Sequence, residues 1–221
     1  SPHDSFTQTD AADDSDSDSR AASHSHTSSS TDAENADGFL SAIFPDFVRI
    51  PLTENLRNSA PIYELIRKYY HGAELKGSGP DGNPIRTVAA ETDDELYHAL
   101  NKTLRELIRK DRIAPNNIAI LTGQDIQNSL LKDRTMVGEY NVQALTDVLQ
   151  KNEPVEHTLY ATIDQFKGVE TPVVILIEMD ALLSRGDDRS VRQVYTAITR
   201  AQVQLIVIAR RKHLDRLLRG F

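Results

Sequence analysis

The sequence predicts an α/β fold in which helices cover both faces of a mainly parallel sheet. Apolar segments of strand length alternate with segments of helical periodicity over most of the 221 residues. Residues 172–177 and 202–209 are almost continuously apolar, which is typical of strands buried on both faces. The first 46 residues lack this alternation, so we expect the folded domain to comprise residues 47–221.

Residues 1–46 are expected to form a disordered tail. They are rich in Ser, Asp, Thr and Ala and contain few large apolar side chains that could offset the entropy of ordering. They carry ten acidic residues and one arginine, a balance of −9, so the formal charge of −8 leaves +1 for residues 47–221. The acidic composition is therefore no argument against an anionic partner for the folded domain.

Composition excludes several classes of function. Cysteine is absent, which rules out disulfides and thiolate metal sites. His24 and His26 lie in a serine tract, where we expect them to be solvated, and no metal site is predicted. The apolar runs are far shorter than the roughly 20 residues that a membrane-spanning helix needs. We therefore expect a soluble cytoplasmic protein without a membrane partner.

The first half of the domain contains two signals for the start of a helix. Asn58-Ser59 can cap a helix with Pro61 in its first turn, and Thr92 with Glu95 three residues later forms a capping-box pattern. KGSGPDG at residues 76–82 has no Gly-Lys-Ser/Thr, so a surface hairpin is predicted rather than a phosphate loop. The elements predicted here are strands at 48–52 and 85–90, and helices from about 60 to 69 and from 93 to about 110.

The second half continues the alternation and ends in a helix whose apolar side chains share one face. The predicted elements are strands at 117–122, 158–161, 172–177 and 202–209, and helices at 124–132, 142–150, 191–201 and around 214–218.

The loop between the strands at 158–161 and 172–177 is rich in side chains that can bind ligands. In open α/β sheets, ligands bind at loops that follow buried strands. A helical segment that ends in Thr199-Arg200-Ala201 lies about twenty residues further on. The loop residues concerned are Thr162, Asp164, Gln165, Lys167, Gly168 and Glu170.

Three blocks of sequence resemble motifs IV, V and VI of the UvrD/Rep-like superfamily 1 helicases, in the same order. They are LTENLRNSAPIYELI at 52–66, TIDQFKGVETPVVIL at 162–176 and VRQVYTAITRA at 191–201. The resemblance covers roughly residues 47–210 and implies the C-terminal RecA-like domain of such an enzyme, with its three-layer αβα fold. The pairing of KGxE before an apolar strand with a later TRA is the most specific part of it.

The resemblance also implies roles for individual residues. Arg57 and Arg200 match the arginines that reach the γ-phosphate of ATP, although each could instead pair with a local carboxylate or a helix C-terminus. Arginine suits the first role because its planar fork binds phosphate bidentately. Glu170 matches the carboxylate that binds the ribose, and Gly168 lets the backbone come close. Thr162 matches a nucleic-acid contact, and Lys167 is either a phosphate contact or a packing lysine.

The sequence departs from the family pattern in several places. Asp164 replaces a His that many relatives have, Phe166 is bulkier than the usual residue, and only 34 residues separate Thr122 from His157, too few for the accessory subdomain of UvrD-type proteins. Tyr195 is expected in the core or at the rim of the cleft. A Walker A loop and an Asp-Glu pair on an apolar strand are missing, so the chain alone is not expected to hydrolyse ATP.

Two functions are consistent with these observations. The first is one half of a helicase, which would bind ATP and Mg²⁺ jointly with a P-loop RecA-like domain and move on single-stranded DNA, with RNA as the alternative strand. The second is a non-catalytic module, derived from such a helicase, that binds nucleic acid or protein.

Overall fold

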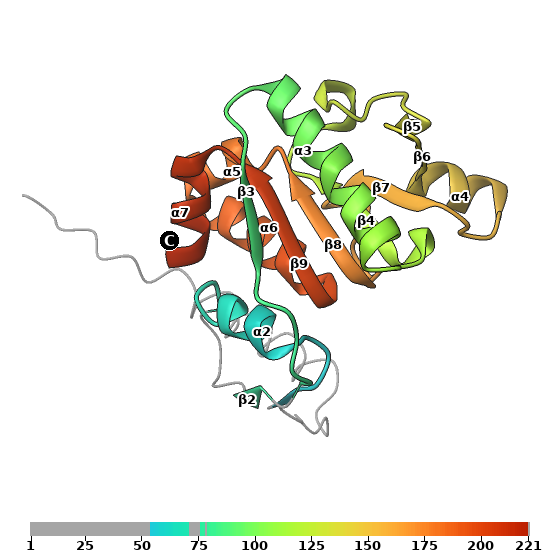
Figure 1. Ribbon diagram of the computed structural model, residues 1–221. Helices are drawn as coiled ribbons and strands as arrows, with labels where there is room; N and C mark the ends of the chain where they lie inside the picture. The colour runs from blue at the N-terminus through green and yellow to red at the C-terminus, as the bar shows by residue number, and fades with distance from the viewer. Residues whose placement is uncertain (1–53, 71–75, 78, 221) are drawn as a thin grey trace, which may run out of the picture. The chain divides into compact units, whose positions relative to one another are not determined.

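A computed structural model describes residues 54–70, 76–77 and 79–220 (Figure 1). The predicted tail at 1–46 and the predicted strand at 48–52 lie outside these residues. Among the described residues, no helix has both the length and the apolar character needed to cross a membrane.

The main sheet has seven strands in the order β3-β9-β8-β4-β7-β6-β5 (Figure 1). All neighbouring pairs are parallel except β5 and β6, which are antiparallel. The parallel sheet predicted from the sequence is therefore confirmed. The strands are β3 (Arg86–Ala89), β4 (Ile118–Thr122), β5 (Met136–Val137), β6 (Tyr140–Ala144), β7 (Thr158–Thr162), β8 (Thr171–Ile177) and β9 (Ala201–Ala209).

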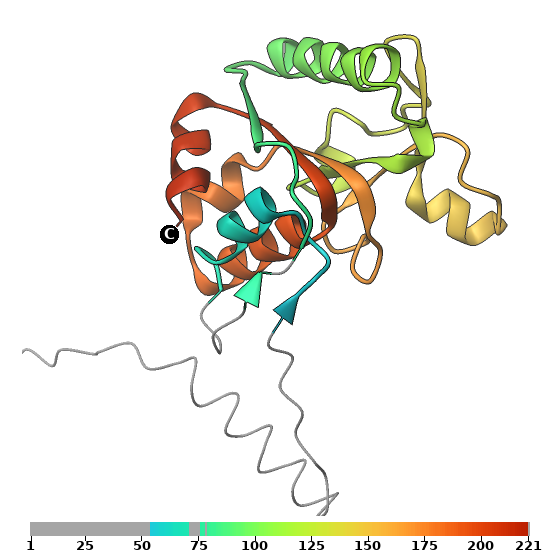
Figure 2. The same cartoon turned by 60° about the horizontal axis from the view of Figure 1, so that its bottom comes forward.

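Helices cover both faces of this sheet, and each face has its own hydrophobic core. Figure 2 shows α3, in green, on one side, and α2, in cyan, on the other side with the orange and red helices. The side chains on both faces of β4 and β8 pack against helices or loops. Almost every residue of these two strands is therefore buried. The helices are α2 (Ala60–Ile66), α3 (Asp93–Arg105), α4 (Leu145–Lys151), α5 (Asp180–Arg185), α6 (Asp188–Thr199) and α7 (Arg211–Arg219).

The capping box before α3 is present with a small change. The Thr92 hydroxyl accepts a hydrogen bond of 3.2 Å from the Glu95 N–H, as the pattern predicts. The Glu95 carboxylate accepts from the N–H of Glu91, at 2.7 Å, rather than from that of Thr92. The helix then continues to Lys110 through a π-helical turn, Glu106–Lys110, which agrees with the predicted end.

The start of α2 is capped differently from the prediction. Ser59 occupies the N-cap position, but its hydroxyl donates to the carbonyl of Val203 instead of capping the helix. The Ala60 N–H donates to the carbonyl of Pro80 at 3.0 Å, so the segment after β2 caps α2. A Cβ on Gly79 would lie 1.9 Å from the Asn58 carbonyl oxygen, which explains the glycine.

The prediction of a hairpin at 76–82 is wrong. Instead, β2 (Lys76–Gly77) pairs in parallel with β1 (Glu54–Asn55), to form a separate two-stranded sheet. Such a pairing joins segments on either side of α2, and a local turn pattern cannot show it.

The helix predicted at 124–132 is also wrong, because only a 3₁₀ turn, Ile126–Asn128, forms there. Polar side chains take the backbone N–H groups that a helix would use. The Asp125 carboxylate accepts from the Gln127 N–H, and the Glu178 carboxylate accepts from the Leu130 N–H. The second of these partners is 48 residues away in the sequence.

The helix predicted at 142–150 begins at Leu145, because the residues before it form β6. Val142, Gln143 and Ala144 pair with β7, which would otherwise have an unpaired edge. The buried residues Tyr140 and Val142 alternate with exposed Asn141, which is the period of a strand. The helix α5 and the strand β5 were not predicted.

Candidate functional site

The loop that contains most of the predicted site residues crosses from one edge of the sheet to the other. We call residues 163–170 the motif V loop. It connects the end of β7 to the beginning of β8, and because both strands run parallel to β4, the two ends of the loop lie at opposite edges. The predicted residues therefore separate into two groups. Thr162 lies at the edge where the strands end, and Glu170 lies where β8 and β9 begin.

Arg57, Glu170 and Arg200 lie together at the edge where β8 and β9 begin. The Arg57 Nε atom lies 2.8 Å from Glu170 Oε2, and the Gln202 side-chain amide donates to Glu170 Oε1 at 3.0 Å. The side chain of Arg57 is 54% exposed and that of Glu170 is 37% exposed. Exposed ion pairs of this kind contribute little to stability, so a ligand could replace either partner at small cost.

Arg200 is held more firmly than Arg57. Its guanidinium donates to the carbonyls of Thr196 and Val169 and to the hydroxyl of Thr199, at 3.2, 3.3 and 3.0 Å. Burial lowers the pKa of this guanidinium and the nearby charge of Arg57 lowers it further, whereas Glu170 and Tyr195 raise it. Two cations and one carboxylate thus occupy a small, partly buried region.

These contacts include both of the local alternatives that the sequence left open for the arginines. Arg57 pairs with a nearby carboxylate, and Arg200 binds carbonyls near the C-terminus of α6. Tyr195, on the same helix, is partly buried and stacks on Tyr70 with 6.0 Å between the ring centroids. This position at the margin of the core agrees with the prediction.

Asn58 positions the segment that contains Arg57, a role that no sequence pattern indicates. Its side chain is buried, and its amide nitrogen donates to the carbonyls of Ala201 and Thr199, at 2.6 and 3.3 Å. These carbonyls flank Arg200 in the chain. Because Asn58 directly follows Arg57, its hydrogen bonds hold the Arg57 segment against the C-terminal end of α6. From the sequence alone, Asn58 had been interpreted as part of a helix cap.

Gly168 adopts a left-handed conformation with φ of +82°, which side chains with a Cβ rarely adopt. No other atom lies within 4 Å of the position that a Cβ would occupy. Gly168 is therefore needed for this left-handed backbone conformation, and not because a side chain at this position would clash with its neighbours. In the turn that follows, the Val169 carbonyl is close enough to Arg200 to accept its hydrogen bond.

Thr162 and Lys167 bind neighbouring residues of their own loop. The Thr162 hydroxyl accepts from the Gln165 N–H at 3.2 Å, and the Gln165 side chain accepts from the Thr162 N–H at 3.0 Å. Lys167 Nζ lies 2.8 Å from Asp164 Oδ1, and this hydrogen bond is the main reason why the pKa of Asp164 is lowered. Phe166 is fully buried and anchors the loop in the core, which accounts for its bulk.

A hollow of about 240 Å³ lies beside Thr162, at the edge where the strands end. A buried carboxylate organises one of its walls. Glu178 accepts hydrogen bonds from the Thr122 hydroxyl, the Ser129 hydroxyl and the Leu130 N–H, at 2.6, 2.6 and 2.9 Å. It keeps the segment after β4 against the sheet although its own φ is +55°. The hollow is lined by Thr122, Gly123, Gln124, Asp125, Thr162, Ile163, Asp164 and Gln193.

Comparison with known families matches residues 158–208 to the model of the UvrD-like helicase C-terminal domain. The match begins at β7 and ends within β9, so it includes the motif V loop and Arg200. Residues 158–208 are therefore similar to the UvrD-like helicase C-terminal domain. Arg57 lies outside the matched residues, so its assignment rests on the resemblance of residues 52–66 and on its contact with Glu170.

Solved structures agree with the fold of this UvrD-like domain. The C-terminal domain of a possible DNA helicase from Lactobacillus plantarum WCFS1 is similar with a TM-score of 0.55 and 14% identity, over 71% of this chain and 88% of that one. At this identity the likeness establishes the fold. An Arterivirus helicase, nonstructural protein 10, gives a TM-score of 0.35 and 18% identity over 80% of this chain and 30% of its own, too low to support an argument. No curated protein sequence matches the chain.

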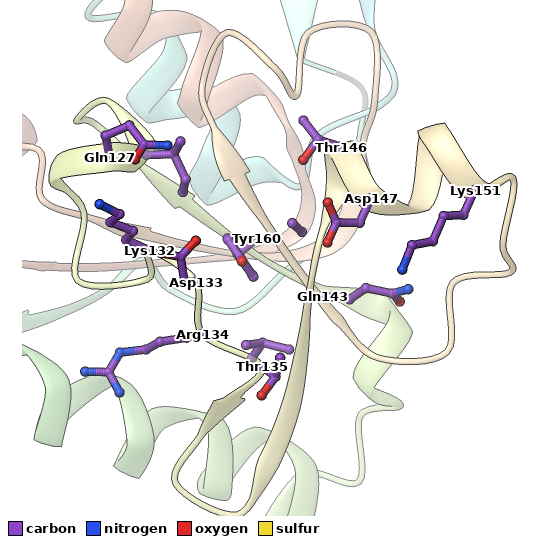
Figure 3. Close-up of a pocket in the computed structure, with 13 residues that line it drawn as sticks. Gln127, Lys132, Asp133, Arg134, Thr135, Gln143, Thr146, Asp147, Lys151 and Tyr160 are labelled. Carbon is purple, nitrogen blue, oxygen red and sulfur yellow. The ribbon is translucent and has the colours of Figure 1, made fainter.

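The UvrD-like domain has a further hollow, of about 510 Å³, that contains none of the predicted site residues (Figure 3). It lies between β6, α4 and the segment before β5. Its charges are mixed: Lys132, Arg134 and Lys151 come with Asp133 and Asp147. The side chain of Tyr160, which is 7% exposed, forms part of its lining. Across the described part of the domain, no group of three or more His, Asp or Glu side chains could hold a metal ion.

Proposed function

We propose that this UvrD-like domain supplies half of an ATP site and contacts a single nucleic-acid strand. The other half, with the P-loop and the carboxylate that holds Mg²⁺, would come from a P-loop RecA-like domain elsewhere in a longer chain or in another protein. The observation that carries the proposal is the convergence of Arg57, Glu170 and Arg200 at one edge of the sheet, with 2.8 Å between the Arg57 and Glu170 side chains.

Each of these three side chains suits one part of a nucleotide. The two guanidiniums would bind the γ-phosphate and stabilise the charge that develops on it during transfer. The Glu170 carboxylate would accept hydrogen bonds from the ribose hydroxyls. Because the Arg57–Glu170 pair is exposed, a nucleotide can separate the two side chains and give each a new partner.

The nucleic-acid strand would lie at the opposite edge of the sheet, where Thr162 and Lys167 are its proposed contacts. Hydroxyl, amide and ammonium groups of this kind bind backbone phosphates without reading the bases. Single-stranded DNA is the proposed strand, and RNA is the alternative because its backbone offers the same phosphates. The motif V loop joins the two sites, so a change at one of them would reach the other through the eight peptide bonds between Thr162 and Glu170.

The test is an Arg200→Ala variant assayed with a P-loop RecA-like domain as partner, at saturating ATP, Mg²⁺ and single-stranded DNA. Loss of an arginine that stabilises the transition state lowers turnover by roughly 10³-fold or more. Turnover is measured as phosphate release. The matched control is Arg105→Ala on α3, which is exposed on the opposite face of the sheet and should leave turnover unchanged.

Because Arg200 also binds backbone carbonyls, each variant is checked by thermal unfolding before the assay. Arg200→Lys provides a second comparison, since it keeps the charge but loses the bidentate fork, and turnover should stay far below that of the unsubstituted chain. Normal turnover of a folded Arg200→Ala variant would contradict the proposal.

One observation favours a non-catalytic binding module as the second candidate. Both arginines have partners within the chain, because Arg57 pairs with Glu170 and Arg200 binds two carbonyls and a hydroxyl. Such a module would bind single-stranded DNA in a salt-dependent way, while phosphate release with the P-loop partner would stay at the level of the partner alone.

A further inference from the structure

A third hollow, of about 330 Å³, lies between the motif V loop and the first two turns of α6. We call it the α6 hollow. Three of the six side chains that line it are cations and one is a carboxylate, which makes it more basic than the hollow beside Thr162. The lining residues are Asp164, Lys167, Arg189, Arg192, Gln193 and Thr196.

Two of the three cations have no carboxylate partner. Arg189 and Arg192 are exposed, and neither forms an ion pair within 4.0 Å in the part of the chain that the structure describes. Asp188 directly precedes Arg189 in the sequence but forms no ion pair with it within 4.0 Å among the described residues, and Asp187 accepts a hydrogen bond from the Ser190 N–H and caps α6. The third cation, Lys167, pairs with Asp164.

The α6 hollow lies next to the hollow beside Thr162. Asp164 and Gln193 line both of them, and the Gln193 amide donates to Asp164 Oδ2 at 3.2 Å. The two hollows therefore form one path along the surface, from Thr162 past this hydrogen bond to Arg192. A nucleic-acid strand that contacts Thr162 would have its next phosphates along this path.

We propose that Arg189, Arg192 and Lys167 bind a backbone phosphate of the strand that Thr162 contacts, and that Asp164 weakens this binding by holding Lys167. This inference rests on the nucleic-acid contact in the proposed function. Guanidinium forks match the geometry of a phosphate, and two unpaired forks beside an ammonium provide enough donors for its oxygens. An arriving phosphate replaces Asp164 as the partner of Lys167. Lys167 holds the pKa of Asp164 below its usual value, so this carboxylate stays charged near neutral pH and repels the phosphate.

The placement of these arginines links the strand to the nucleotide site. Arg192 and Arg200 lie on the same helix and its C-cap, eight residues apart, which corresponds to roughly 12 Å along the axis. A phosphate bound by Arg192 therefore acts on the rigid helix that also places Arg200. The motif V loop and α6 then form two parallel connections between the two edges of the sheet.

The test is the binding of a fluorescein-labelled oligo(dT) to the full chain, measured by fluorescence anisotropy over a series of salt concentrations. In the double variant Arg189→Gln, Arg192→Gln we expect at least tenfold weaker binding at low salt. Each lost phosphate contact reduces the slope of log K against log[salt] by about 0.7 for a single strand, so the double variant, which loses one such contact, should lose about 0.7. The control is Arg105→Gln, Arg112→Gln, which removes the same charge from two exposed arginines outside the hollow.

Asp164→Asn tests the second part of the proposal, and its expected effect has the opposite sign. The amide oxygen can still accept from Gln193, but the negative charge is gone and Lys167 is released, so we expect several-fold tighter binding. Unchanged or weaker binding would overturn the role of Asp164.

Other outcomes separate this inference from the function on which it rests. If the unsubstituted chain binds oligo(dT) and the double variant binds as well as its control, the α6 hollow is not a phosphate site, while the proposed function stands. If the unsubstituted chain shows no salt-dependent binding to oligo(dT) or oligo(U), both this inference and the nucleic-acid contact at Thr162 are overturned. The ATP-site roles of Arg57 and Arg200 are tested separately by phosphate release.

Discussion

His213 on α7 is a buried titratable side chain away from both proposed sites. It is 6% exposed, and its Nε2 atom lies 3.3 Å from Asp180 Oδ1. Burial lowers its pKa below 6.5, and the nearby cations Lys212, Arg210 and Arg216 lower it further, although Asp180 opposes the shift. The unfolded chain therefore takes up a proton at a higher pH than the folded chain does.

This shift predicts a loss of stability in mild acid. The free energy of unfolding should be highest above pH 6.5 and should fall as the pH is lowered from there through the folded pKa of His213. Urea unfolding at a series of pH values measures it for the unsubstituted chain and for His213→Gln. The difference between the two proteins should change across this range. A difference that is constant with pH would show that His213 titrates alike in both states.

The contacts of individual side chains are the part of the site that the sequence predicted least. The resemblance located Arg57, Glu170 and Arg200, and the structure brings them together. It gave no indication of the roles of Asn58 and Glu178. The carbonyls that accept from the Asn58 amide nitrogen and the groups that donate to the Glu178 carboxylate lie 48 or more residues away in the sequence. A buried Asn or Glu has no local pattern, because its role depends on which distant backbone groups lack a partner.

The junction of α2 and α6 is the contact between elements on which the proposed ATP site most depends. Asn58→Ala leaves the carbonyls of Thr199 and Ala201 without this donor in a buried region, which should cost about 2 kcal/mol in the free energy of unfolding. Urea unfolding measures this loss, and Asn141→Ala on the exposed side of β6 is the control, expected within about 0.5 kcal/mol.

The same variant should also lower phosphate release in the assay with the P-loop partner, at a temperature where it is fully folded. Asn58 touches no proposed ligand and acts by positioning, so the defect should be smaller than that of Arg200→Ala. A folded Asn58→Ala variant with normal turnover would show that the α2–α6 junction is needed for stability only.

Elements differed in how well the sequence predicted them, for a physical reason. The strands β4, β8 and β9 were predicted within one residue of each end because burial on both faces over most of their length makes their sequences largely apolar. In contrast, β6 is short and was assigned to a helix, since its pairing with β7 depends on a distant segment. Leu130 and Leu131 contributed to a helical spacing, but Glu178 holds their segment in another conformation.

The direction of the strands in the sheet places the two proposed sites at opposite edges. The proposed nucleotide contacts lie where β8 and β9 begin, and the proposed nucleic-acid contacts lie where β7 ends. The motif V loop crosses between these edges without a helix, so its buried Phe166 is the main anchor in the core. The resemblance implies different ligands for Thr162 and Glu170, and the fold places these two residues at opposite edges of the sheet.

The charge of the chain as a whole leads to a last prediction, which concerns residues 1–46. Their removal changes the formal charge from −8 to +1, so a polyanion would meet weaker long-range repulsion. We expect residues 47–221 to associate with oligo(dT) faster than the full chain at low salt, and equally fast at about 1 M salt, where the Debye length is roughly 3 Å. Stopped-flow anisotropy measures both rates.

A full-length variant with every Asp of the tail replaced by Asn should behave like the truncated chain, because the effect depends on charge and not on length. Since the sequence predicts a disordered tail, its removal should leave the free energy of unfolding within about 0.5 kcal/mol. A rate difference that persists at high salt, or a marked loss of stability, would mean that these residues act through specific contacts instead.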